Sequence, residues 1–103
     1  MNSSEAPCRN VTITVEVANC FSKAAKDADR KLNETYAQVL SVLQTNDQQK
    51  LRASQRLWIQ FRDANCRFYG SQEGTIRQIQ AAECLRAMTQ DRALELEKAM
   101  KFD

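Results

Sequence analysis

The chain has 103 residues and lacks histidine altogether, with only two glycines, one proline and no long apolar run. β-Hairpins and sandwiches depend on turns rich in Gly and Pro, so this scarcity argues against a β-rich fold. A helix that spans a bilayer needs about 18 or more consecutive apolar residues. No stretch approaches that length, so we expect no transmembrane segment. The start, MNSSEAP, also lacks the apolar part of a secretion signal; if the protein is exported, its signal has already been removed.

The absence of histidine removes a common general base and the commonest side-chain ligand of transition metals. The sequence also shows no Gly-rich phosphate loop, no nucleophile elbow and no close CxxC pair of the kind that binds zinc. A cysteine nucleophile would have no histidine to activate it. We therefore expect a protein that is not an enzyme and that needs neither a metal ion nor a cofactor.

Basic and acidic residues number 15 and 13 and are mostly interleaved, which gives a formal net charge of +2. Proteins that bind nucleic acid usually carry a strongly basic face or stripe. At this overall balance we expect no nucleic-acid partner, and the net charge does not favour an anionic membrane.

What the chain has instead is a composition dominated by Ala, Leu, Gln, Lys, Arg and Glu, which lose little side-chain entropy in a helix. Apolar residues at spacings of three and four predict helices over about 14–44, 47–69 and 75–101. Residues 11–17 alternate Thr and Val as a strand would, so the start of the first helix is ambiguous. We expect an all-α fold, a small three-helix antiparallel bundle, with an N-terminal arm (1–13) and a single helical domain (14–103).

Four cysteines are present, Cys8, Cys20, Cys66 and Cys84. An even number of widely spaced cysteines in a small chain favours disulfides formed in an oxidising compartment, whereas four free thiols in a cytosolic protein are the alternative. Of three possible pairings, the sequential one, Cys8–Cys20 with Cys66–Cys84, closes two short loops. Each loop would contribute about 3 kcal/mol in the chain-entropy model. We expect these two disulfides and an exported protein.

The segment QRLWIQFRDANC, residues 55–66, holds the one tryptophan of the chain. Trp58 and Arg62 stand four residues apart on one helical face, where the guanidinium can lie over the indole. Asp29 belongs to a polar column on the first helix, and we predict that it pairs with Arg62. The polar seam that we expect to fix the register of the helices consists of Asp29, Asn33, Tyr36, Trp58, Arg62 and Asp63.

The second predicted helix has an apolar side and a basic side. We expect the apolar side to face the core; it consists of Leu51, Leu57, Trp58, Phe61, Ala64 and Phe68. Arg52, Arg56 and Arg67 form the basic side, where Asp63 stands four residues before Arg67 and can pair with it. Such a face can meet an anionic surface, although a solvated face whose arginine stems cover apolar surface is the simpler interpretation.

Three ordered segments resemble a known family: DADRKLNETYAQVL (27–40), LRASQRLWIQFRDANC (51–66) and AAECLRAMTQDRALEL (81–96). Together they are similar to the small exported bacterial domain named after the mycobacterial lipoprotein LprI, described as a lysozyme inhibitor. The matching positions are Asp29, Leu32, Asn33, Tyr36, Leu51, Gln55, Trp58, Arg62, Asp63, Cys66, Glu83, Cys84, Thr89, Arg92 and Leu96. The resemblance implies a helical protein of the bacterial periplasm or cell surface.

An inhibitor normally offers a protruding group to the cleft of an enzyme. The loop after the second helix carries Tyr69, Gln72 and Glu73, and we expect it to project beyond the end of the bundle as a recognition element. The first hypothesis is therefore a protein that binds and inhibits another protein, either a lysozyme-like or other cell-wall hydrolase or a toxin against which it gives immunity. The second is an envelope module whose Arg52, Arg56 and Arg67 bind an anionic glycan or lipid head group. The oligomeric state stays open.

Overall fold

A computed structural model describes residues 8, 14–71, 74 and 76–101 of the chain. The described part forms three α-helices: α1 (Thr14–Val42), α2 (Thr45–Tyr69) and α3 (Ile76–Lys101). The predicted all-α fold is confirmed, and the helix limits differ from the expected ones by two residues or fewer. Of the ambiguous stretch, residues 14–17 form the first turn of α1, whereas residues 11–13 lie outside the described residues.

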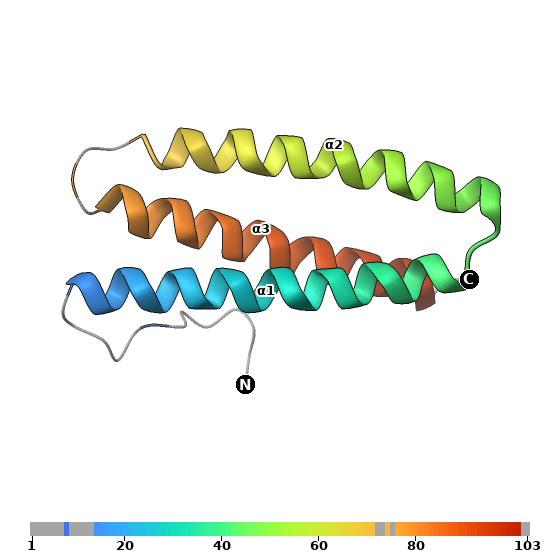
Figure 1. Cartoon of the computed structure of the whole chain (residues 1–103), viewed down its shortest axis with the longest axis horizontal. Helices are drawn as coiled ribbons and strands as arrows, with labels where there is room; N and C mark the ends of the chain where they lie inside the picture. Colours follow the sequence, from blue (N-terminus) through green and yellow to red (C-terminus); the bar gives the residue numbers. More distant parts are fainter. Residues whose placement is uncertain (1–7, 9–13, 72–73, 75, 102–103) are drawn as a thin grey trace.

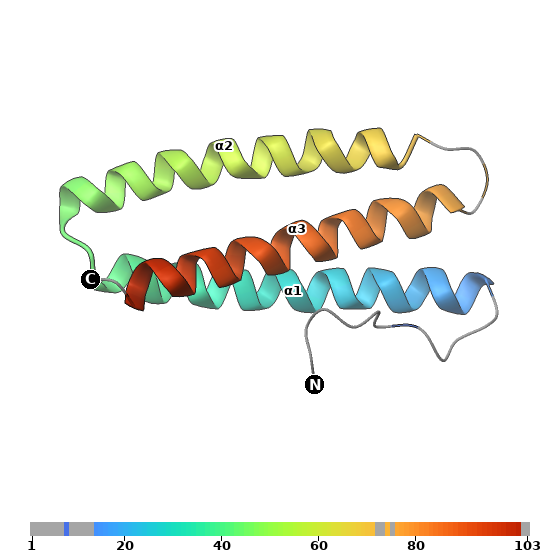
Figure 2. The same ribbon diagram turned by 180° about the vertical axis from the view of Figure 1, so that it is seen from behind.

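The helices run up, down and up, so α2 is antiparallel to both of its neighbours (Figure 1). Seen from either side, α3 lies between the other two over much of its length (Figure 2). The interface of α3 with α1 is the larger one, and α1 and α2 approach each other only marginally. Principal extents of 48 × 29 × 16 Å describe a flattened bundle. One broad side of α2 is therefore left facing away from the other helices.

The hydrophobic core lies between α1 and α3. Its central cluster consists of Leu32, Val39, Ala93 and Leu96, all buried. Leu32 and Val39 stand seven residues apart on α1, which places them on one face of the helix two turns apart. From α2, Leu51 and Trp58 pack against this cluster while staying partly buried. The burial of apolar surface therefore joins α1 firmly to α3, and α2 reaches the core with only two large side chains.

Glycine is required at two positions between α2 and α3. Gly70 ends α2, and a Cβ atom there would lie 3.0 Å from the Cβ of Ala81 on α3, closer than such atoms normally approach. Gly74 has a φ of 81°, in the left-handed region that favours glycine. These two positions allow the chain to turn tightly and bring the end of α2 against the start of α3.

Both predicted disulfides are confirmed with the sequential pairing, so the alternative of four free thiols is wrong. Cys8 is buried and bonded to Cys20 of α1. Cys66 of α2 is bonded to Cys84 of α3, with 5.4 Å between the Cα atoms. The two cysteines reach the same height because α3 begins further along the bundle than α2 ends (Figure 1).

The prediction that the apolar side of α2 faces the core is wrong for most of its residues. Leu57, Phe61 and Phe68 are 67%, 62% and 68% exposed, and Ala64 is exposed as well. The physical reason is the rotation of α2. Its disulfide and its polar side chains face α3, which turns the apolar residues toward solvent.

Candidate protein-binding site and the polar seam behind it

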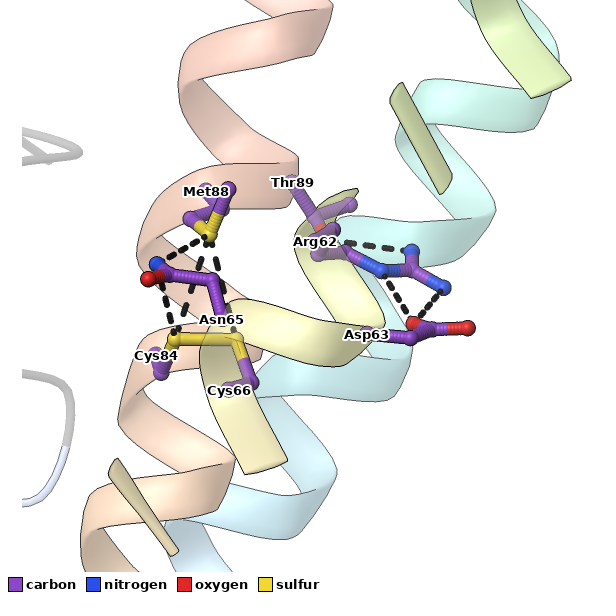
Figure 3. Close-up of a disulfide and its surroundings, with 7 residues drawn as sticks. All are labelled: Arg62, Asp63, Asn65, Cys66, Cys84, Met88 and Thr89. Atoms are coloured by element: carbon purple, nitrogen blue, oxygen red, sulfur yellow. Dashed lines mark hydrogen bonds and ion pairs between the residues drawn. A yellow bond between two sulfur atoms is a disulfide. The ribbon is translucent and has the colours of Figure 1, made fainter. Parts of the chain in front are cut away.

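Arg62 connects all three helices through its guanidinium group. It donates hydrogen bonds to Asp63 at 2.9 Å on its own helix, to Asp29 at 3.4 Å on α1, and to the Thr89 hydroxyl at 3.5 Å on α3. Figure 3 shows Arg62 with Asp63 and Thr89. The Arg62 side chain is mostly buried, and a buried guanidinium is costly unless its donors are matched by acceptors. Its three acceptors therefore help to fix where α2 sits.

Trp58 contacts two arginines. The Cζ atoms of Arg62 and Arg92 are 5.2 and 5.8 Å from the indole ring centroid, both within the range of cation–π attraction. Arg92 reaches across from α3 and donates to the side chains of Gln55 at 3.0 Å and Ser54 at 3.2 Å, and it also pairs with Glu95 on its own helix. The indole is thus in contact with two cations that are themselves tied to other groups.

The predicted seam therefore comes together only in part. Asp29, Trp58, Arg62 and Asp63 form one cluster, whereas Asn33 is exposed and Tyr36 packs against the apolar core instead. Sequence reasoning did not assign Gln55, Thr89 and Arg92 to the seam, although all three belong to the family-like pattern. The spacing of apolar residues cannot reveal such positions, because a buried polar residue looks like an interruption of an apolar helical face.

The Cys66–Cys84 disulfide lies one turn from Arg62 toward the end of the bundle. The Asn65 side-chain amide points at the sulfur of Met88, 3.2 Å away, and the Met88 sulfur lies 3.9 Å from each disulfide sulfur (Figure 3). These contacts are weaker than hydrogen bonds to oxygen. They cover the disulfide on one side with side chains of α2 and α3.

Arg86 is a second buried arginine on α3. Its guanidinium donates two hydrogen bonds to the Glu83 carboxylate one turn earlier, and these bonds raise the pKa of Arg86 above its ordinary value. A further bond goes to the side chain of Gln90. Arg86 therefore stays charged, with Glu83 and Gln90 among its partners.

A pocket of about 430 Å³ lies near the end of the bundle where α2 ends, lined by all three helices. Phe21 of α1, Tyr69 of α2 and Ile79 of α3 contribute to its mostly apolar wall. Tyr69 is half exposed, and its ring packs edge to face against Phe68 with 5.2 Å between centroids. Gln80, which also lines the pocket, has a buried Oε1 atom with no hydrogen-bond partner within the described part of the chain. A buried acceptor without a partner is unusual, and it can accept a donor from a bound molecule.

A second hollow of about 350 Å³ is lined by residues of α1 and α3 and by Arg62 of α2. Asp29 and Arg62 line it, and they are already paired with each other. Because Asp29 and Arg62 are matched with each other, we interpret this hollow as part of the seam, with the exposed Lys26 at its edge.

The structure describes some of the predicted recognition residues and not others. Tyr69 stands at the rim of the bundle-end pocket, whereas Gln72 and Glu73 lie outside the described residues. Arg52, Arg56 and Arg67 are all exposed. The predicted pairing of Asp63 with Arg67 is wrong, because Asp63 is bound to Arg62 instead. No ion pair within the described part of the chain includes an arginine of this basic side.

Comparison with known proteins gives one clear result. The model of the family described as "Lysozyme inhibitor LprI" matches residues 6–96. The chain belongs to the LprI family. An uncharacterized protein of Rhizobium meliloti (strain 1021), R02472, is 27% identical over 112 aligned residues, covering 94% of this chain and 81% of that protein. No solved structure matches the chain.

Membership of the LprI family agrees with the chemistry of the described residues. All four cysteines are held in disulfides, and the described residues contain no group of acidic or cysteine side chains that could hold a metal ion. Within the same residues, no helix is long and apolar enough to cross a bilayer. The description of the LprI family as a lysozyme inhibitor fits a protein that binds another protein. What the site offers is a surface for binding: an aromatic rim, an apolar pocket and one buried acceptor.

Proposed function

We propose that this LprI-family protein binds a lysozyme-like cell-wall hydrolase outside the cytoplasm and inhibits it without catalysing a reaction. The observation that carries the proposal is the family match, which covers nearly the whole chain. The two disulfides support an oxidising compartment, the place where cell-wall hydrolases act. A toxin that degrades the cell wall is a target of the same kind, in which case the inhibition would give immunity.

The bundle end is the surface that we propose for this contact. Half-exposed aromatic residues such as Tyr69 often supply much of the binding energy of protein interfaces. Beside Tyr69, the bundle-end pocket can take a side chain of the target, and the Gln80 Oε1 atom can accept a hydrogen bond from it. Gln72 and Glu73 follow Tyr69 in the chain, and we propose that Glu73 adds an acidic group for an enzyme with a cationic surface. The Cys66–Cys84 disulfide keeps the scaffold behind this surface rigid.

The first experiment is an inhibition assay with oxidised protein and a panel of animal and bacterial cell-wall hydrolases, at low and moderate salt. We expect at least one hydrolase to be inhibited at micromolar protein or below. Tyr69→Ala and Glu73→Ala should each weaken the inhibition about tenfold or more, as expected for a residue at the centre of an interface.

Glu34→Ala is the matched control for Glu73→Ala, because Glu34 is an exposed glutamate in the middle of α1. It should inhibit like the unaltered protein. Absence of inhibition across the panel would contradict the proposed function. Inhibition that survives Tyr69→Ala and Glu73→Ala would keep the function and move the contact away from the bundle end.

A further inference from the structure

Four exposed apolar residues of α2 form one continuous line, which we call the α2 stripe: Leu57, Phe61, Ala64 and Phe68. Their spacings of four, three and four residues place them on one side of the helix over about 16 Å. Scattered apolar residues on a surface are normal, but a line that holds two phenylalanines and a leucine is a contiguous patch, and such patches mark interaction sites.

The rotation of α2 about its own axis is fixed, so the α2 stripe does not result from a loosely placed helix. On the opposite side, Gln55 accepts from Arg92, Arg62 binds three acceptors, and Cys66 is bonded to Cys84. Turning the stripe toward α3 would break all of these contacts together. The structure therefore holds the apolar residues outward.

Beside the stripe runs a basic row, Arg52, Arg56 and Arg67. Arg56 immediately precedes Leu57 and Arg67 immediately precedes Phe68, so the row lies about 100° around the helix from the stripe. Between residues 50 and 67 the chain has five basic residues and one acidic residue, and that residue, Asp63, is bound to the inward Arg62. The outer face of α2 therefore carries a concentrated positive charge that the net charge of +2 conceals.

A helix with Phe and Leu on one side and unmatched arginines beside them has the pattern of helices that lie in the interface of a membrane. We propose that the outer face of α2 binds an anionic lipid surface, with the α2 stripe entering the head-group region and the basic row contacting anionic head groups. Each arginine near such a surface adds to the attraction. This inference does not depend on the inhibition of a hydrolase.

Two features favour a lipid surface over other occupants. In a second copy of the chain, a stripe-to-stripe contact would bring two basic rows together, and like charges at an interface are unfavourable. The stripe is also a ridge and not a hollow, because Leu57, Phe61 and Phe68 line neither of the two pockets described above. A ridge on the edge of a flat bundle fits a soft, extended surface better than it fits a small ligand.

The test is vesicle flotation of the oxidised protein with phosphatidylglycerol mixed into phosphatidylcholine, against phosphatidylcholine alone. We expect binding about tenfold or more stronger on the anionic vesicles, and a steep loss of binding at high salt. Leu57→Ser/Phe61→Ser and Arg56→Gln/Arg67→Gln should each weaken binding about tenfold. Leu57 and Phe61 are chosen because they lie away from the bundle-end pocket, so hydrolase inhibition without lipid should be unchanged.

The matched control is Val42→Ser/Lys26→Gln, which removes one exposed apolar residue and one exposed cation from α1. It should bind vesicles like the unaltered protein. Equal binding to both kinds of vesicle, or no binding to either, would overturn the proposal. It would also be overturned if sedimentation showed a dimer that Leu57→Ser/Phe61→Ser dissolves, because a second copy would then cover the stripe.

Discussion

Helix α3 meets its two neighbours through interfaces of opposite character. Against α1 it buries an apolar cluster in which Leu32 and Val39 face Ala93 and Leu96. Against α2 it presents a disulfide, a threonine and an arginine, and these meet Cys66, Arg62 and Gln55. Apolar packing is non-directional, whereas hydrogen bonds and disulfides have strict geometry. Polar groups and sulfur therefore decide the rotation of α2, and its own apolar residues do not.

This difference separates two tasks within a small protein. The α1–α3 pair supplies most of the hydrophobic core, so α2 contributes Leu51 and Trp58 to it and its phenylalanines are not needed for folding. A disulfide and a tryptophan in contact with two arginines then secure α2 in one orientation. Phe61 and Phe68 stay available on the surface as a result.

The largest contrast should come from truncating one leucine in each region. Leu32→Ala removes a side chain that is only 1% exposed, and we expect a loss of about 2–5 kcal/mol in the free energy of unfolding. Leu57→Ala removes an exposed side chain and should change it by less than about 0.5 kcal/mol. Urea unfolding followed by circular dichroism measures both. A large loss for Leu57→Ala would mean that the stripe is buried in solution.

Removing the disulfide should have the next largest effect. We expect the double variant Cys66→Ala/Cys84→Ala to lose about 3 kcal/mol of stability, in line with an 18-residue loop. The loss should be uneven, because α2 depends on this bond more than α1 and α3 do. Hydrogen exchange should show faster exchange along α2, with α1 and α3 protected for longer. An equal increase in the exchange rate of all three helices would show that the bundle unfolds as one unit. The two interfaces of α3 would then differ less than we infer.

The polar seam should give an intermediate effect. Arg62→Met leaves Asp29 and Asp63 without their partner, and we expect a loss of about 1–3 kcal/mol because the arginine is mostly buried. Asp29→Asn should cost less than about 1 kcal/mol, since Asp29 is half exposed and solvent screens the pair. Melting temperatures of both variants test this. If neither changes, the seam does not fix the register of the helices.

Much of the fold could be predicted from the sequence, because helix limits and disulfides follow from local signals. The spacing of apolar residues predicted the start of α3 within one residue, the even cysteine count predicted two disulfides, and the short loops of the sequential pairing favoured the one that is present. The Asp29–Arg62 and Trp58–Arg62 contacts could also be predicted from the sequence. Trp58 and Arg62 stand four residues apart on one helix, and the carboxylate of Asp29 is a natural partner for the arginine.

The orientation of α2 was not predictable in the same way. A hydrophobic pattern indicates a helix, but it does not say whether the apolar side faces this protein or another surface, and Leu57 and Phe61 illustrate the error. Arg92 was missed for a related reason. Its charge suggests an exposed side chain. Only the three-dimensional arrangement shows that Arg92 donates hydrogen bonds to Gln55 and Ser54 and contacts the ring of Trp58.

The smallest effect should come from an ion pair on α1 that lies outside both interfaces. The hydrogen bond from Lys23 lowers the pKa of Asp27 below its ordinary value. A carboxyl with a lowered folded-state pKa stabilises the fold above its unfolded pKa, and this contribution is lost as the pH falls through the folded pKa. Asp27→Asn should therefore be slightly less stable near neutral pH and equal to the unaltered protein at strongly acidic pH. Urea midpoints across this range measure the difference. A difference as large as that of Arg62→Met would show that surface pairs on α1 matter as much as the seam that holds α2.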